Sequence, residues 1–248
     1  MTPGKAPAWL SDTPLAHRGL HGDGVPENSL AAFRAAAAAG YGVELDVMLA
    51  RDGTPVVVHD PVLTRLTGAA RRVGELDLAQ LRELRLRAAD GTATDEVVPT
   101  LAEALEALDG APAMVEVKSS RLRAGRLERA VAEVLDDHDG PACVASFNPA
   151  TVRWFRRNRP DAVRVLTATA QLDPRLPALV QRRLSELKDV VAVAPHAISY
   201  DLQGLPNTAT DAWRATGGVL VTWTVASTDD LAKGREVADN VIFEGVRP

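Results

Sequence analysis

Residues 42–61 read GVELDVMLARDGTPVVVHDP, and this stretch decides the fold that we predict for the chain. Its first half is typical of a β-strand in which Glu44 and Asp46 are two residues apart, so both carboxylates point to the same face. The dipeptide Asp52-Gly53, favoured in two-residue hairpin turns, precedes a second β-rich segment that ends in His59-Asp60. With this turn, Asp46 would lie directly opposite His59. The stretch therefore predicts two acids and an imidazole on one patch, a suitable place for a metal ion and a proton-transfer group.

An ordinary surface hairpin is the alternative interpretation, because carboxylates in proteins usually face water. Glu44 and Asp46, however, interrupt an apolar strand, where an unpaired charge is costly to bury. Their position favours a functional site.

Length and composition suit one large domain spanning residues 1–248, and 46% of the residues are hydrophobic, which is ample for a core. The formal net charge of −5, without a polybasic tail, argues against nucleic acid as the main ligand. The first twenty residues contain no signal-peptide core, and no stretch approaches the ~20 apolar residues that span a bilayer. The single cysteine, Cys143, allows no internal disulfide. We expect a cytoplasmic protein without a stable membrane anchor.

Strand-like and helix-like segments alternate along the chain, with expected strands beginning near residues 14, 42, 113, 142, 163, 196, 218 and 240. Helices are expected between them, including segments near 122–137 and 174–188 and a helix capped by Thr100 and Glu103. Residues 62–98 interrupt this alternation as a small insertion after the second strand's hairpin, with a short helix capped by Asp77. The repeated unit predicts an α/β fold, a (β/α)8 TIM barrel. An open doubly wound sheet is less favoured, because His17-Arg18-Gly19-Leu20 stands where a glycine-rich phosphate loop would follow the first strand.

Unexpected polar residues fall where the expected strands end, which is where barrels of this kind place their active sites. Three carboxylates, on Glu44, Asp46 and Glu116, suit a hard divalent cation such as Mg²⁺ or Ca²⁺. Arg18 and Lys118 are suitable donors to phosphate oxygens. Two histidines, His17 and His59, can divide the roles of general base and general acid. Together these groups suit displacement at a phosphodiester.

The sequence resembles the glycerophosphodiester phosphodiesterase family over almost its whole length. The motifs that carry the resemblance are HRG at 17–19, PENSLAAF at 26–33, GVELDVMLARDGTPVVVHD at 42–60, PTLAEAL from 99, EVK at 116–118, SF at 146–147 and WT at 223–224. The resemblance implies that His17 and His59 are the catalytic acid–base pair and that Glu44, Asp46 and Glu116 bind the metal. It also implies substrate- and phosphate-binding roles for Arg18, Lys118, Glu27 and Trp223. The expected substrate is a small glycerophosphodiester, cleaved to glycerol 3-phosphate and an alcohol.

Two departures from the family pattern affect the late part of the chain. Ala226 stands where family members often have Asn, and Glu244 stands where they often have Asp. These changes put contacts to the glycerol or leaving group in doubt. A phosphodiesterase acting on lysophospholipids, a non-catalytic barrel that binds phosphate esters and a metal-dependent sugar isomerase or lyase are the alternatives. The oligomeric state is not predicted.

Overall fold

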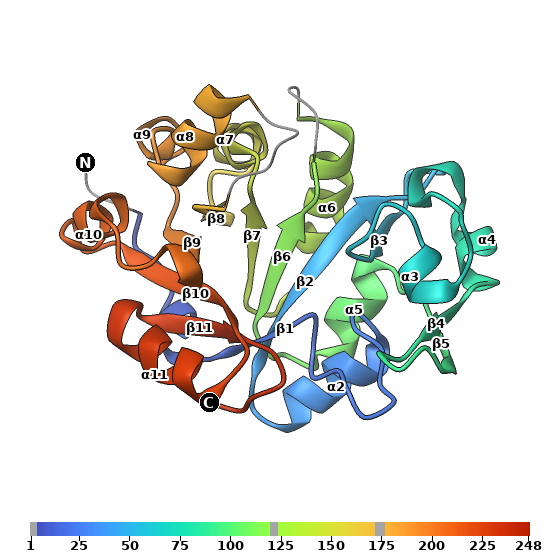
Figure 1. Cartoon of the computed structure of the whole chain (residues 1–248). Coiled ribbons are helices and arrows are strands. Elements are labelled where there is room, and N and C mark those ends of the chain that lie inside the picture. The colour runs from blue at the N-terminus through green and yellow to red at the C-terminus, as the bar shows by residue number, and fades with distance from the viewer. Residues whose placement is uncertain (1–3, 120–123, 172–176) are drawn as a thin grey trace. The chain divides into compact units, whose positions relative to one another are not determined.

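The structure is a computed structural model that describes residues 4–119, 124–171 and 177–248 (Figure 1). It comprises two compact units, one of Leu15–Ala142 and one of Met1–Pro14 with Cys143–Pro248. The expected strand–helix alternation is present along the sequence of both units. Each unit is described by itself.

In the unit 15–142, a parallel sheet joins β1 (Leu15–His17), β2 (Gly42–Leu49) and β6 (Ala113–Val117), as Figure 1 shows. β2 lies between the other two, and most of its residues are buried. Such a strand is expected to be almost continuously apolar, because both faces of a parallel sheet are covered. Glu44 and Asp46 are the exceptions in β2.

Helices with well-defined caps follow these strands. α2 (Leu30–Ala38) begins after Ser29, whose side chain accepts a hydrogen bond from the amide of Ala32. α5 (Leu101–Ala107) has the predicted capping box, in which Thr100 and Glu103 each accept a backbone N–H. α6 spans Arg126–Asp136, so the part of its expected range that includes Leu122 lies outside the described residues.

The predicted register of the hairpin is wrong by one residue. β3 (Pro55–Val57) pairs antiparallel with β2, and Val47 faces Val57, so Asp46 lies beside Val58 rather than His59. The reason is the turn: the amide of Gly53 donates to the carbonyl of Ala50, and Gly53 has a φ of 96°. A left-handed glycine after a type I turn makes a three-residue loop, whereas the prediction assumed a two-residue turn.

The insertion after this hairpin has a small apolar core of its own. It contains α3 (Thr64–Thr67), a 3-10 turn (Val73–Glu75), α4 (Leu78–Arg82) and the antiparallel strands β4 (Arg85–Arg87) and β5 (Ala93–Val97). Asp77 caps α4, as predicted, whereas the β4–β5 hairpin was not predicted. Leu63, Leu66 and Leu81 are buried against β3 residues in one cluster, which fixes α3 beside the end of the hairpin.

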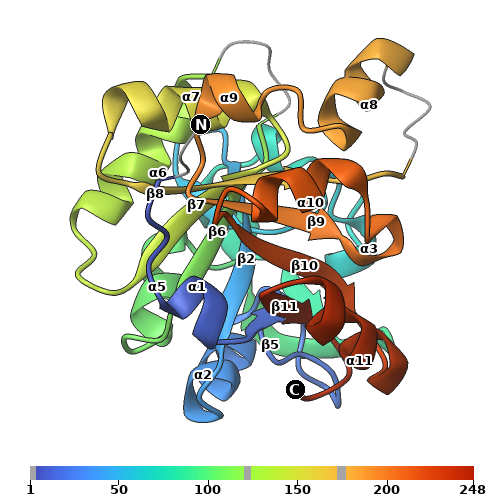
Figure 2. The same cartoon turned by 90° about the vertical axis from the view of Figure 1, so that its left-hand side faces the viewer.

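The other unit contains a parallel sheet of β7 (Ala142–Ser146), β8 (Val163–Ala168), β9 (Ala197–Asp201), β10 (Val219–Val225) and β11 (Asn240–Phe243). Its helices are α1 (Trp9–Asp12), α7 (Pro149–Asn158), α8 (Ala178–Ser185), α9 (Val190–Val193), α10 (Thr208–Arg214) and α11 (Thr228–Val237). Figure 2 shows α10 beside β10 and α11 beside β11. The expected start of α8 near Pro174 lies outside the described residues. None of the helices in the described ranges has the length and apolar character needed to cross a bilayer.

Candidate active site

The register of the sheet brings four polar side chains together at the ends of β1 and β6 and in the middle of β2. His17 at the end of β1 is the register partner of Glu44 on β2. Asp46, two residues further along β2, is the register partner of Glu116 on β6. The carboxyl ends of parallel strands share one edge of a sheet, so the site lies at the edge where barrels carry their active sites.

The three carboxylates form one tight cluster. Each of Glu44, Asp46 and Glu116 has an oxygen within 4.8 Å of those of the other two. Glu44 and Asp46 are buried, and the side chain of Glu116 is only 12% exposed. Burial, reinforced by repulsion from Asp46 and Glu116, raises the pKa of Glu44 well above its usual value.

Lys118 compensates two of these carboxylates but not the third. Its Nζ lies 2.9 Å from Asp46 Oδ1 and 2.9 Å from Glu116 Oε1. Burial alone would raise the pKa of Asp46, but Lys118, His59 and Arg18 together hold it below its usual value. Glu44 Oε2, in contrast, is buried without a hydrogen-bond partner in the described part of the chain. The cluster therefore has an unsatisfied carboxylate oxygen.

A divalent cation fits this donor set. Three closely spaced carboxylates are hard oxygen ligands of the kind that Mg²⁺ and Ca²⁺ prefer. A buried oxygen without a partner, such as Glu44 Oε2, has a free energy cost that a bound cation would remove.

Arg18 adds a second cation, positioned by the turn after β1. Its Nε is 3.2 Å from Asp46 Oδ2, an ion pair without hydrogen-bond geometry, and its NH1 donates to Glu27 at 2.8 Å. Gly19 has a φ of 84°, and a Cβ there would lie 2.8 Å from the Cβ of Ala32. A glycine is therefore required where the chain turns back over α2.

Asn28 is a site residue that the sequence reasoning missed. Its Nδ2 donates to Asp46 Oδ2 at 2.9 Å, although its residue has a φ of 53°. Asn tolerates this left-handed conformation better than most residues. The available signal was its place beside Glu27 in the PENSLAAF motif.

The two histidines have different surroundings. His17 Nε2 is 3.9 Å from Glu44 Oε2. His59 Nδ1 is 2.7 Å from Asp60 Oδ1, an interaction that the sequence reasoning also missed. Burial, helped by Lys118 and Arg18 and opposed by Asp46, lowers the pKa of His59. A neutral ring that donates from Nδ1 to a carboxylate keeps Nε2 free to accept a proton.

A pocket of about 450 Å³ opens beside Lys118. It is lined by Met48 and Leu49 of β2, by residues 72–75 of the insertion and by residues 125–128 at the start of α6. A ligand bound at Lys118 therefore has adjoining space that the insertion helps to form.

Trp223 belongs to the other unit. It packs edge to face on Phe147, with ring centroids 5.5 Å apart and an interplanar angle of 87°. Its indole Nε1 is buried and has no hydrogen-bond partner among the residues that the structure describes. A role for Trp223 in substrate binding stays a prediction.

The chain is similar in sequence to known glycerophosphodiester phosphodiesterases. Human glycerophosphodiester phosphodiesterase 1 is 35% identical over 162 residues, which are 62% of this chain and 48% of that protein. A glycerophosphodiester phosphodiesterase of Caldanaerobacter subterraneus subsp. tengcongensis is 31% identical over 152 residues, 59% of this chain and 62% of that protein. The matches thus span less than two thirds of either relative.

Solved structures show the fold. A phosphodiesterase from Oleispira antarctica, in complex with the product sn-glycerol-3-phosphate, is 26% identical and has a TM-score of 0.78, over 93% of this chain and 92% of that chain. The likeness confirms the predicted fold class, an α/β fold of the (β/α)8 barrel type. The family model described as "Glycerophosphoryl diester phosphodiesterase family" matches residues 17–243. By this match over most of its length, the chain belongs to the glycerophosphoryl diester phosphodiesterase family.

Proposed function

We propose that the protein is a metal-dependent phosphodiesterase that hydrolyses glycerophosphodiesters to glycerol 3-phosphate and an alcohol. The observation that carries the proposal is the carboxylate cluster of Glu44, Asp46 and Glu116, with one oxygen unsatisfied, beside two partly buried cations, Arg18 and Lys118. Family membership and the named activity of the relatives support the same reaction.

In this proposal, Glu44, Asp46 and Glu116 hold a divalent cation, either Mg²⁺ or Ca²⁺. When bound, the cation would act as a Lewis acid that stabilises negative charge on the phosphoryl oxygens. Arg18 and Lys118 would bind the same phosphate, because a guanidinium and an ammonium both donate to anionic oxygens. Both cations already lie against Asp46, so they are held beside the metal ligands before substrate binds.

His17 and His59 would move the protons. The glycerol hydroxyl next to the ester attacks phosphorus, one histidine accepts its proton, and the other donates a proton to the oxygen of the departing alcohol. The products of this step are the free alcohol and a cyclic phosphate. Water then opens the ring with the roles of the histidines reversed, which gives glycerol 3-phosphate. The lowered pKa of His59 keeps its ring neutral and suits the accepting role in the first step.

Two further residues, Glu27 and Trp223, would support substrate binding. Glu27, which accepts from Arg18 at 2.8 Å, would hold the guanidinium in its phosphate-binding position. Trp223 would offer its buried indole N–H, which has no partner in the described residues, to the bound molecule. The departing alcohol would occupy the pocket beside Lys118.

The test is an assay of glycerol 3-phosphate release from glycerophosphocholine by the purified protein, with Mg²⁺ or Ca²⁺ and after EDTA. We expect release that requires a metal and is lost in Glu44→Gln. His138→Ala, which changes a histidine beyond the end of α6, is the matched control and should keep wild-type activity. No release with either metal would contradict the proposal, and lysophospholipids would be the next substrates. Failure with those as well would favour a phosphate-ester-binding protein.

A further inference from the structure

Arg65 is the residue through which the insertion reaches the candidate site. It lies on α3, and its guanidinium binds two carboxylates from different parts of the chain. NH1 and NH2 donate to the two oxygens of Glu27 at 2.6 and 2.9 Å, and Nε donates to Asp60 Oδ2 at 2.7 Å. A bidentate pair holds the carboxylate in one orientation in addition to neutralising its charge, because the two N–H groups of the planar guanidinium match the two carboxylate oxygens.

Each of the two carboxylates in turn holds a proposed functional side chain. Asp60 uses its other oxygen to contact His59 Nδ1 at 2.7 Å. Glu27 accepts from Arg18 at 2.8 Å. Arg65 therefore contacts both the carboxylate that binds the His59 imidazole and the carboxylate that binds the Arg18 guanidinium. Ion pairing with Arg65 lowers the pKa of both carboxyls against the opposing effect of burial, so both remain ionised.

The orientation of Asp60 decides which nitrogen of His59 is free. A carboxylate on Nδ1 selects the tautomer with hydrogen on that nitrogen and leaves Nε2 for proton transfer. Without Arg65, the Asp60 side chain has no second hydrogen-bond or ion-pair partner among the described residues to hold it against the imidazole. A carboxylate free to rotate would hold the ring less tightly.

We propose that Arg65 is a positioning residue, which fixes the tautomer and orientation of His59 through Asp60 and the orientation of Arg18 through Glu27. The kinetic part of this inference rests on the proposed function. The side chain of Arg65 is 52% exposed. Exposed ion pairs add little to stability. If the role of Arg65 were purely structural, its replacement would therefore change both the unfolding free energy and the turnover rate only slightly.

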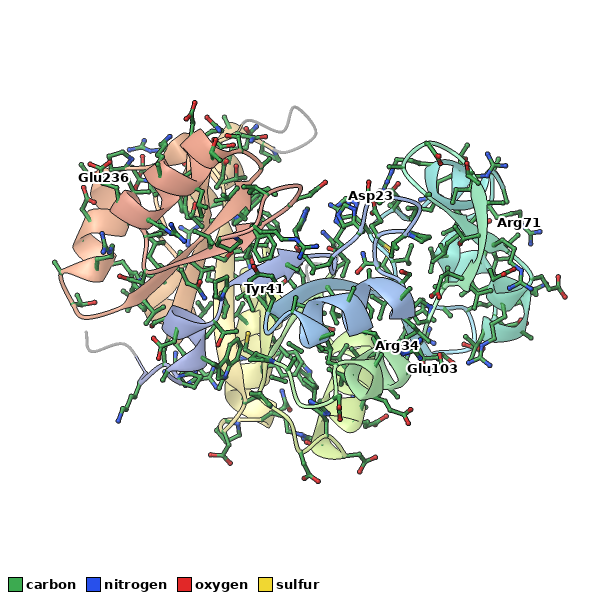
Figure 3. All side chains as sticks on the ribbon, turned by 90° about the horizontal axis from the view of Figure 1, so that it is seen from below. Asp23, Arg34, Tyr41, Arg71, Glu103 and Glu236 are labelled. Carbon is green, nitrogen blue, oxygen red and sulfur yellow. The ribbon has the colours of Figure 1, made fainter. Side chains whose placement is uncertain are left out.

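The experiment compares Arg65→Met, Arg65→Lys and Arg71→Met in the full chain. Arg71 belongs to the same insertion and is labelled in Figure 3, and its side chain makes no hydrogen bond or ion pair with the described residues. We expect Arg65→Met to lower kcat about 10- to 100-fold, the size of effect that small misplacements of reacting groups have. Tm should hardly change. Arg65→Lys should recover part of the loss, and Arg71→Met should match the wild type.

A double-mutant cycle separates positioning from simple loss of packing. In an Asp60→Asn background, Arg65→Met should cost less than in the wild type, because one of the two carboxylates through which it acts is gone. Additive losses, or a kcat of Arg65→Met within twofold of the wild type, would overturn the inference. If the wild type itself hydrolyses no glycerophosphodiester, the proposed function has failed instead.

A readout without turnover keeps the inference testable in that case. The ¹⁵N chemical shifts of the histidine ring report which nitrogen carries hydrogen, and the His59 signals are assigned by their loss in His59→Ala. We expect the Nδ1–H form to dominate in the wild type and in Arg71→Met, and a mixture of tautomers in Arg65→Met and Asp60→Asn. Unchanged shifts in Arg65→Met would refute the positioning role.

Discussion

Replacing Lys118 with methionine should destabilise the metal-free protein more than replacing any exposed charged residue with an uncharged one. Lys118 keeps a buried ion pair with Asp46 and a second with Glu116, each at 2.9 Å, and its own side chain is 18% exposed. Met preserves the length of the side chain but leaves both carboxylates without their shared cation. Glu44 adds a third negative charge to the same cluster.

The size of the effect follows from burial. Removing one partner of a fully buried ion pair costs about 3–5 kcal/mol, so a slightly exposed lysine should cost about 2–4 kcal/mol. For a chain of this length, that loss lowers Tm by roughly 4–16 °C. A divalent cation at saturating concentration should restore much of the loss, because it supplies the missing positive charge, and a ligand at about 100 times its Kd stabilises by about 2.7 kcal/mol.

The assay is urea unfolding at about pH 8, in EDTA and then with Mg²⁺ or Ca²⁺. Arg82→Met is the matched control. It breaks an ion pair with Glu103 whose side chains are 46% and 38% exposed, and it should cost no more than about 1 kcal/mol. A metal-free loss below about 1 kcal/mol for Lys118→Met, or a loss that metal leaves unchanged, would refute the reasoning.

Three further predictions concern single residues. His17→Ala and His59→Ala should each abolish turnover of glycerophosphocholine and leave the circular dichroism spectrum unchanged; near-wild-type activity in either would contradict the acid–base assignment. Burial would raise the pKa of Glu27, but Arg65 and Arg18 lower it. Ionised Glu27 therefore stabilises the folded protein at pH values above its ordinary pKa of 4.5, and this contribution is lost as the pH falls through the lowered pKa of the folded state. Glu27→Gln should therefore flatten the acid limb of a plot of unfolding free energy against pH, and an unchanged limb would show that Glu27 does not contribute. Gly19→Ala should destabilise by about 1–3 kcal/mol, because alanine is strained at a φ of 84° and meets Ala32, and a Tm equal to that of the wild type would contradict this.

The parts of the fold that local patterns encode were predictable from the sequence. Apolar residues recur with different spacings in buried strands and in amphipathic helices, so the positions of the strands can be predicted from the order of apolar and polar residues. The capping box of α5 was equally readable, because Thr100 and Glu103 interact within one turn of helix. The residues of the carboxylate cluster were predictable because they interrupt apolar strands where the strands end.

Features that depend on one backbone conformation or on distant partners were not predictable. Asp52-Gly53 suits both a two-residue turn and a three-residue loop. The two-residue type I′ turn needs a positive φ at both residues, whereas here Gly53 has a positive φ and Asp52 does not. Arg65 is one of several arginines in the insertion, and nothing in its spacing shows that it binds Glu27, 38 residues earlier. Its contact depends on the apolar packing that positions α3.

The charges of the connected site do not cancel, and this imbalance links its ligands. With neutral histidines and every carboxyl group ionised, as metal binding requires, the site has three cations and five carboxylates: Arg18, Arg65 and Lys118 against Glu27, Glu44, Asp46, Asp60 and Glu116. A phosphodiester would add negative charge to a cluster that already has an excess of two, whereas a divalent cation would offset that excess. Cation and phosphate ester should therefore bind cooperatively, and thermodynamic reciprocity requires each to raise the affinity for the other by the same factor. A dissociation constant for either one then has meaning only at a stated concentration of the other.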